Sequence, residues 1–196
     1  MKIFGITGGT GAGKTTTLTV LSEMDMAILD CDVIYHELIC TSRTLQDALT
    51  DRFGNVFNHA GLDRKKLGAV VFQNPEALTE LNNITMHFIE DEVHRRIFLS
   101  KEEGRPGVAI DAVGLLESRV KYECDALVAV LAPEEIRVRR IMEREGITEE
   151  YARDRINAQR SEEYFRKHCK YILENNGTES DFRKKIYELF SRLLAE

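Results

Sequence analysis

The sequence lacks the features expected of a nucleic-acid-binding or membrane protein. Its 196 residues include 27 basic and 33 acidic side chains, and the net charge of −6 provides no overall positive field for nucleic acid or an anionic membrane. No apolar run approaches membrane-spanning length, and the first strand starts so early that we expect no signal peptide. We therefore expect a cytoplasmic protein, a monomer or weak homo-oligomer, that binds neither nucleic acid nor membranes.

The four cysteines show none of the spacings that indicate zinc or a disulfide framework. They are scattered, with no Cys-x-x-Cys pair and no matching histidine cluster, at Cys31, Cys40, Cys124 and Cys169. Internal repeats, low-complexity segments and flexible linkers are also lacking. A chain of this length with 43% hydrophobic residues predicts one α/β domain with at most a small additional lobe.

Residues 8–15, Gly-Gly-Thr-Gly-Ala-Gly-Lys-Thr, have the spacing of a phosphate-binding P-loop. An apolar strand signal at 3–6 precedes them and a helix signal begins at 16, which is the order that the motif requires. Glycines allow the backbone N–H groups to surround phosphates, and the helix N-terminus adds partial positive charge. The predicted contacts to ATP are Gly9, Gly11, Ala12, Gly13, Lys14, Thr15 and Thr16.

Two of these residues have chemical roles beyond binding. Lys14 supplies a mobile cation for the outer phosphates and is a candidate catalytic residue, while the hydroxyl of Thr15 is suited to a bridging Mg²⁺ ion. The expected cofactors are therefore ATP and Mg²⁺.

Four more apolar runs, at 26–29, 108–111, 126–131 and 171–175, predict the other strands of a five-stranded parallel sheet flanked by helices. Two of these runs have acidic residues at or just after their carboxyl ends, and the carboxyl ends of parallel strands line the ligand crevice. Asp111 is the candidate second ligand of Mg²⁺. Asp30 and Asp32, one residue apart on an extended chain, should point to opposite sides, and we assign the site to Asp32.

Residues 33 to about 100 show helical spacing without strand signals, and Asn74-Pro75 marks a helix start. The part from about 35 to 104 is a helical insertion that either binds the acceptor or only covers the sheet. His36 and His87 lie within it as candidate acceptor contacts, with a surface position for His36 and a structural role for His87 as the alternatives.

Residues 134–170 are arginine-rich and helical, which suits a lid that closes over a transferring phosphoryl group. Interleaved acids indicate that most of these arginines lie on a solvated face. Arg140 and Arg144 share one helix face, and either could serve the site. The nucleotide-binding core is then about 1–34, 105–133 and 171–196, within one P-loop kinase domain.

A P-loop by itself is shared by many reaction classes, so its companions decide between them. The Asn-Lys-x-Asp motif of GTPases is lacking, and motor or repair ATPases need a longer chain. The remaining pattern predicts a kinase for a small hydroxyl or phosphate acceptor. Asp32 would accept or orient the acceptor proton, while Lys14, Mg²⁺ on Thr15 and lid arginines balance charge.

Short motifs lie in order along nearly the whole chain. They are residues 6–15, 29–32, 62–64, 67–68, 71–72, 81–82 with 87, then 111, 139–141 with 144, 155–156 with 159, and 175–177. In these motifs the chain resembles the dephospho-CoA kinase family. The resemblance implies phosphorylation of the ribose 3′-hydroxyl of dephospho-CoA by ATP and magnesium, on a five-stranded P-loop fold with a helical CoA-binding lobe and a lid. It also implies that Asp32 is the base, that Arg140 is a lid residue near the nucleotide, and that Asn175 and Gly177 form the adenine-side turn.

The sequence differs from the family pattern mainly where the acceptor is expected. His36 replaces an arginine, Phe88 replaces a proline, residues 111–117 read Asp-Ala-Val-Gly-Leu-Leu-Glu, and Cys169-Lys170 replaces Ala-Asp. Two alternatives therefore accompany the dephospho-CoA prediction. One is a P-loop kinase for another nucleoside or nucleotide, and the other is a regulator that binds ATP without transferring phosphate.

Overall fold

Five short apolar segments pair into one sheet, in the order β2-β5-β1-β6-β7. Their bounds are β1 Lys2–Thr7, β2 Ala27–Asp30, β5 Gly107–Asp111, β6 Ala126–Leu131 and β7 Tyr171–Glu174. β1 pairs in parallel with both β5 and β6, and its register sets Ile6 opposite Asp111 on one side and Val128 on the other. The predicted five-stranded parallel sheet is confirmed.

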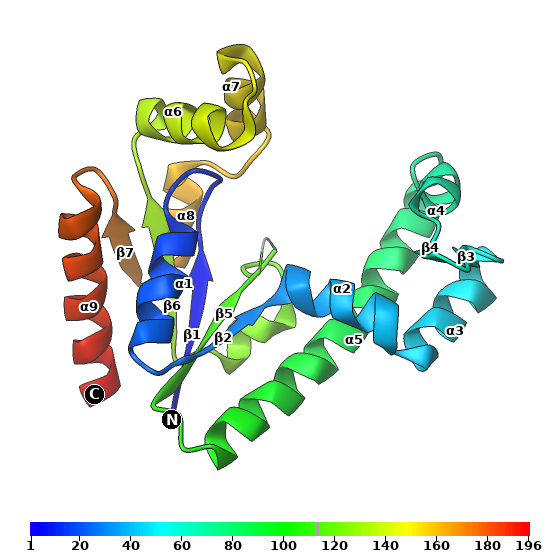
Figure 1. Cartoon of the computed structure of the whole chain (residues 1–196), viewed down its shortest axis with the longest axis horizontal. Coiled ribbons are helices and arrows are strands. Elements are labelled where there is room, and N and C mark those ends of the chain that lie inside the picture. The colour runs from blue at the N-terminus through cyan, green and yellow to red at the C-terminus, as the bar shows by residue number, and fades with distance from the viewer. Residues whose placement is uncertain (113) are drawn as a thin grey trace. The chain divides into compact units, whose positions relative to one another are not determined.

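Figure 1 shows this sheet in a computed structural model, which describes residues 1–112 and 114–196. The chain divides into two compact units. Unit 1 comprises Met1–Leu29 and Leu99–Glu196, and unit 2 comprises Asp30–Phe98. Val113, in the stretch after Asp111 that differs from the family pattern, lies outside the described residues.

Helices cover both faces of the sheet in unit 1. Their bounds are α1 Lys14–Glu23, α6 Glu134–Glu145, α7 Glu149–Asn157, α8 Glu162–His168, α9 Glu179–Ala195 and the 3₁₀ helix η1 Arg119–Glu123. On one face α1 and α9 lie side by side, and the apolar stripe predicted for the last helix supplies Phe182, Ile186 and Phe190 to the core. Burial of these aromatic and aliphatic side chains drives the helix onto the sheet.

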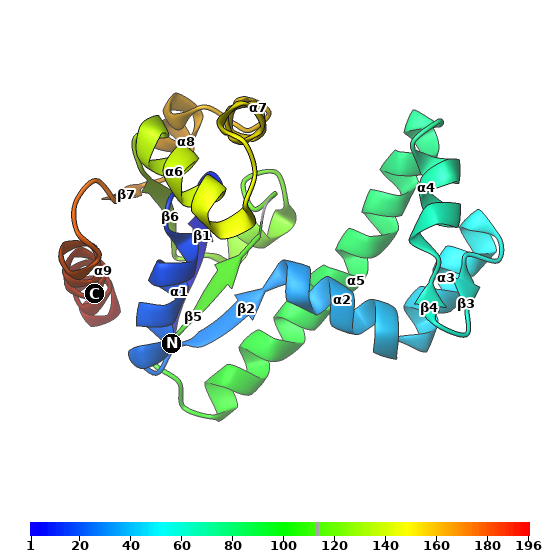
Figure 2. The same cartoon turned by 45° about the horizontal axis from the view of Figure 1, so that its top comes forward.

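The opposite face is closed by α8, where Phe165 and Cys169 pack against Leu116, Ala129 and Leu131. Burial raises the pKa of the Cys169 thiol to about 11, so this cysteine stays protonated at neutral pH. Helices α6, α7 and α8 gather near the end of the sheet at which β1 runs into the glycine loop (Figure 2). This part of unit 1 positions the site.

Unit 2 is mostly helical and has a small core of its own. Its elements are α2 Cys31–Thr41, α3 Arg43–Phe53, β3 Phe57–Asn58, β4 Gly61–Leu62, α4 Arg64–Val71 and most of α5 Pro75–Glu102. Leu45, Leu49 and Phe53 of α3 are buried against Leu67 and Val71 of α4. The start of α5 at Pro75 agrees with the helix start expected from Asn74-Pro75, because Asn74 accepts hydrogen bonds from the first free N–H groups.

The prediction that residues 33 to about 100 contain no strands is wrong in one place. β3 and β4 form an antiparallel hairpin, in which Phe57 pairs with Leu62 and Asn58 with Gly61. Each strand has only two residues, too few for an alternating pattern to be visible in the sequence. Among the described residues, no helix combines the length and apolar character needed to cross a bilayer.

Candidate functional site

The glycine loop between β1 and α1 is shaped by close contacts that exclude side chains. Gly8, Gly11 and Gly13 all have positive φ values, of 139°, 77° and 116°. A Cβ atom on Gly8 would lie 2.2 Å from the carbonyl oxygen of Val130, and one on Gly13 would lie 2.3 Å from Nδ2 of Asn175. Glycine is therefore required at these positions by both backbone conformation and space.

Lys14 begins α1, and its side chain turns back across the loop. Its Nζ donates a hydrogen bond to the carbonyl oxygen of Gly8 over 2.9 Å. Gly13 is the N-cap of this helix and offers no side-chain hydrogen bond, so no cap side chain occupies the leading N–H groups next to the loop. A cation and the positive end of a helix dipole thus share one place, which favours a phosphate.

Asn175 holds the loop through side-chain hydrogen bonds. The residue is 4% exposed, its Nδ2 donates to the carbonyl oxygen of Ala12 over 2.9 Å, and its Oδ1 accepts from Arg140 over 3.1 Å. The backbone N–H of Asn175 donates to Leu131, which attaches this turn to the end of β6. The sequence did not indicate this support, because the partners are up to 163 residues apart. A contact of Asn175 or of exposed Gly177 with adenine stays a prediction.

Arg140 and Arg144 both line a pocket of about 320 Å³ beside the loop. The loop residues of this pocket are Gly9, Thr10, Gly11, Gly13, Lys14 and Thr15. Arg140 donates to the carbonyl oxygen of Gly11 over 3.2 Å, whereas Arg144 pairs with the carboxylate of Glu145 over 2.6 Å. Because only Arg140 has neutral oxygens as its partners, it is the better placed of the two to meet an anion.

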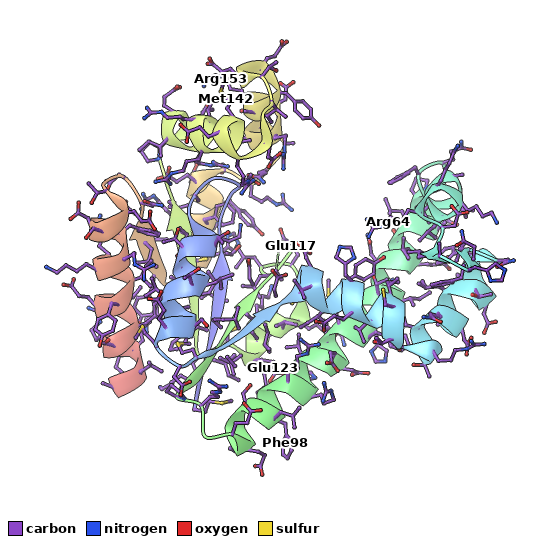
Figure 3. All side chains as sticks on the ribbon, viewed as in Figure 1. Arg64, Phe98, Glu117, Glu123, Met142 and Arg153 are labelled. Atoms are coloured by element: carbon purple, nitrogen blue, oxygen red, sulfur yellow. The ribbon has the colours of Figure 1, made fainter. Side chains whose placement is uncertain are left out.

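A second pocket, of about 560 Å³, shares Gly9, Thr10 and Lys14 with the first. Its lining also includes Glu117, Arg160 and Tyr164. Glu117 (Figure 3) accepts hydrogen bonds from Arg160 Nε over 3.2 Å and from the Tyr164 hydroxyl over 3.1 Å. Tyr164 had no signal in the sequence, since its partner lies 47 residues earlier in the chain.

The two candidate metal ligands occupy different elements of unit 1. Asp111 ends β5 and pairs in register with Ile6, one residue before β1 ends. Thr15 lies in the first turn of α1, is exposed, and lines the 320 Å³ pocket. A hydroxyl and a carboxylate are the oxygen ligands that Mg²⁺ takes in phosphoryl-transfer enzymes, so these residue types fit that ion. Their role stays a prediction.

In unit 2, the expectation that Asp30 and Asp32 lie on one extended segment is wrong. β2 ends at Asp30, and α2 begins at Cys31. Oδ1 of Asp30 accepts from the N–H groups of Asp32 and Val33 over 2.9 and 3.1 Å, so Asp30 is the N-cap of α2. Asp32 is exposed in the first helical turn, which leaves its carboxylate available for chemistry.

The two candidate histidines of unit 2 lie on different helices and have separate partners. His36 of α2 is exposed, and its Nδ1 lies 3.2 Å from Nη2 of Arg64, which opens α4 (Figure 3). His87 of α5 is 72% exposed, and its Nε2 lies 3.7 Å from Asp91. His36 therefore belongs to a small basic pair, whereas His87 has an acidic neighbour.

A protein-family model described as dephospho-CoA kinase matches residues 2–181. The chain belongs to the dephospho-CoA kinase family.

Relatives cover nearly the whole chain. The dephospho-CoA kinase of Dehalococcoides mccartyi is 35% identical over 188 residues, which are 95% of this chain and 94% of that protein. The dephospho-CoA kinase of Carboxydothermus hydrogenoformans is 31% identical over 194 residues, 98% of this chain and 94% of that protein.

Solved structures agree in fold. A Thermus thermophilus protein superposes with a TM-score of 0.75 at 29% identity, covering 98% of this chain and 97% of its own. The dephospho-CoA kinase from Campylobacter jejuni has a TM-score of 0.62 at 22% identity, covering 97% and 96%, which supports the fold.

Membership of the dephospho-CoA kinase family confirms the predicted activity class. The chain is a kinase that uses ATP and a small-molecule acceptor, and its family converts dephospho-CoA to coenzyme A.

Proposed function

We propose that this chain transfers the γ-phosphoryl group of ATP to the ribose 3′-hydroxyl of dephospho-CoA. The observation that carries the proposal is the glycine loop itself, with Lys14 held across it and Asn175 and Arg140 supporting it. Such a preorganised set of donors is what phosphoryl transfer needs, since catalysis there consists mostly of positioning and charge stabilisation.

On the nucleotide side, the N–H groups of the loop and of α1 would hold the phosphates of ATP. The contacts proposed are Gly9, Gly11, Ala12, Gly13, Lys14, Thr15 and Thr16, with Asn175 and Gly177 toward the adenine. Thr15 and Asp111 would hold Mg²⁺, which neutralises charge on the phosphate oxygens when it is bound. Lys14 and Arg140 would balance the charge of the transferring group.

On the acceptor side, Asp32 would act as the base. Its carboxylate takes the proton of the 3′-hydroxyl as that oxygen bonds to the γ-phosphorus, and the bond from that phosphorus to the β–γ bridging oxygen breaks to release ADP. His36 and His87 would contact the acceptor, and the basic His36–Arg64 pair suits an anionic group. We assign acceptor binding to the helical insertion and lid function to residues 134–170.

The cellular setting of the proposed reaction follows from its substrates. Both are soluble nucleotide derivatives, and we propose a cytoplasmic enzyme that acts as a monomer or weak homo-oligomer and does not use nucleic acid.

The test is ADP release by the purified protein with ATP and Mg²⁺, with dephospho-CoA, other nucleotides and nucleosides compared as acceptors. Asp32→Asn should lower kcat by about 10²-fold with little change in the KM for ATP. Asp30→Asn is the matched control, since asparagine also caps helices and should retain near-normal turnover.

Each other result points to a different conclusion. Stimulation by another nucleoside or nucleotide alone would mean that the differences near the acceptor have changed specificity. ATP binding without turnover on any acceptor would favour the regulator. Equal loss in the Asp30 and Asp32 variants would remove the argument for Asp32 as the base.

A further inference from the structure

Arg137 of α6 is a half-buried cation whose hydrogen-bond partners are neutral. Its Nε donates to the carbonyl oxygen of Thr10 and its Nη2 to Oε1 of Gln159, each over 2.8 Å. Within residues 1–112 and 114–196, no carboxylate lies within ion-pair distance of it. Burial lowers the pKa of Arg137, against smaller opposite effects of Glu134 and Glu162, but a guanidinium stays charged at neutral pH.

Another arginine of the same region shows how different this environment is. Arg153 of α7 (Figure 3) forms ion pairs with Glu134, Glu135 and Glu149 over 2.8 to 2.9 Å. These carboxylates raise its pKa. The charge of Arg153 is satisfied within the protein, whereas that of Arg137 has no anion bonded to it, which is a costly arrangement for a partly buried cation.

The side-chain oxygen of Gln159 is bound in the way a phosphate oxygen would be. Oε1 accepts one hydrogen bond from the N–H of Thr10 over 2.9 Å and one from Arg137, while Nε2 donates to Oγ1 of Thr10 over 2.7 Å. A loop N–H and a guanidinium converging on one oxygen are a typical anion-binding arrangement. Gln159 is itself exposed, just after α7, so water can replace its bonds readily.

This contact lies on the phosphate loop and at a pocket wall. A Cβ on Gly9 would lie only 2.3 Å from Nη2 of Arg137 and 3.0 Å from Oε1 of Gln159. The guanidinium therefore lies directly against the loop backbone at Gly9. Gly9, Thr10, Lys14 and Gln159 all line the 560 Å³ pocket.

We propose that Arg137 is a further ligand of the ATP phosphates, and that the side-chain oxygen of Gln159 occupies the position of a phosphate oxygen until ATP displaces it. The inference rests on the proposed role of the loop as the ATP phosphate site. It adds a lid residue that binds the nucleotide and a neutral side chain that competes with it.

Three variants test the proposal by titration with ATP, tripolyphosphate and adenosine. The binding of the weak ligands is measured by displacement of a fluorescent ATP analogue. Arg137→Gln should weaken ATP and tripolyphosphate about tenfold and leave adenosine unchanged. Gln159→Glu puts a carboxylate at the anion position, so it should also weaken ATP about tenfold while raising the Tm of the free protein. Arg153→Gln is the control and should change no affinity.

In Gln159→Glu the affinity for ATP should fall while the Tm of the free protein rises. This result separates competition with the ligand from a purely structural role of Gln159, because a structural role would lower or raise affinity and Tm together. The proposal is overturned if Arg137→Gln weakens adenosine as much as tripolyphosphate, or if Gln159→Glu binds ATP normally. A wild-type protein that does not bind tripolyphosphate at all would instead refute the loop as the phosphate site, so the two failures are distinguishable.

Discussion

The glycine loop of unit 1 and the candidate acceptor residues of unit 2 are held in place very differently. The loop is contacted by side chains from α6, from the connection after α7 and from the turn after β7. Asp32, His36 and His87 are exposed, and the two histidines contact side chains of unit 2, His36 that of Arg64 and His87 that of Asp91. The glycine loop is thus held by several side chains, while the candidate acceptor residues of unit 2 are exposed.

This difference predicts which substitutions should change stability and which should change only turnover or affinity. A preorganised site couples binding to stability, because the same hydrogen bonds hold the loop and shape it for phosphate. An exposed residue with few contacts is not needed for folding, so its loss should change turnover or acceptor affinity alone.

The largest effect is expected from Lys14→Ala, which should lower kcat by about 10³-fold, since it removes the cation closest to the developing charge. The measurement is steady-state ADP release. Lys185→Ala is the control. Lys185 also donates to a backbone carbonyl oxygen, that of Glu174, but it lines neither of the two pockets formed by the loop residues. A normal rate in the Lys14 variant would contradict the assigned role.

Asn175→Ala should lower both the stability of the protein and its affinity for ATP. It leaves the Ala12 carbonyl and the Arg140 guanidinium without their buried partner, which costs about 2 kcal/mol in the free energy of unfolding and raises the KM for ATP. Urea denaturation and steady-state kinetics measure the two effects. Exposed Asn176, whose Oδ1 accepts from Lys185, is the neighbouring control. A change in KM without loss of stability would mean that the loop does not depend on this support.

A smaller effect is expected on the stability of unit 2 rather than on its candidate site residues. Hydrogen bonds from Arg95, and also from Arg96, lower the pKa of Glu92 from 4.5 to about 2 despite its partial burial. Because the folded pKa is the lower one, the stabilisation is complete above pH 4.5 and is lost as the pH falls toward 2.

Glu92→Gln should therefore lower the free energy of unfolding by about 1 kcal/mol at pH 7, since the arginines are partly solvated, and by much less near pH 3. Urea denaturation at the two pH values measures this. Asp91→Asn on the same helix is the control, being 68% exposed with only a 3.7 Å contact to His87. If the loss of unfolding free energy in Glu92→Gln were the same at both pH values, the charge of Glu92 would not be the source of its stabilisation.

The smallest effect is expected for His36→Ala. The KM for dephospho-CoA should rise about threefold, because His36 is exposed and contacts Arg64. The Tm and the KM for ATP should not change. Exposed His59, in the loop between β3 and β4, is the control. A loss of stability in the His36 variant would erase the contrast between the two regions.

The sequence was sufficient wherever structure follows from local pattern. Buried parallel strands appear as continuous apolar runs, so all five strands of the sheet were predicted. The spacing of residues 8–15 identified the phosphate loop because each position is required by local backbone geometry. The two-residue hairpin strands were missed, since a periodic pattern needs more residues than they contain.

Only the tertiary structure revealed which side chains meet at the loop. The contacts of Thr10 with Gln159 and of Ala12 with Asn175 join residues 149 and 163 positions apart, and no periodicity links such distant positions. The structure also separated Asp30 from Asp32, because the helix cap depends on where β2 stops and α2 starts. By itself the sequence determined the fold and the reaction class, through local patterns and motifs. The folded chain decided that Arg137 donates to the Thr10 carbonyl and the Gln159 side chain, because such contacts depend on packing between distant segments.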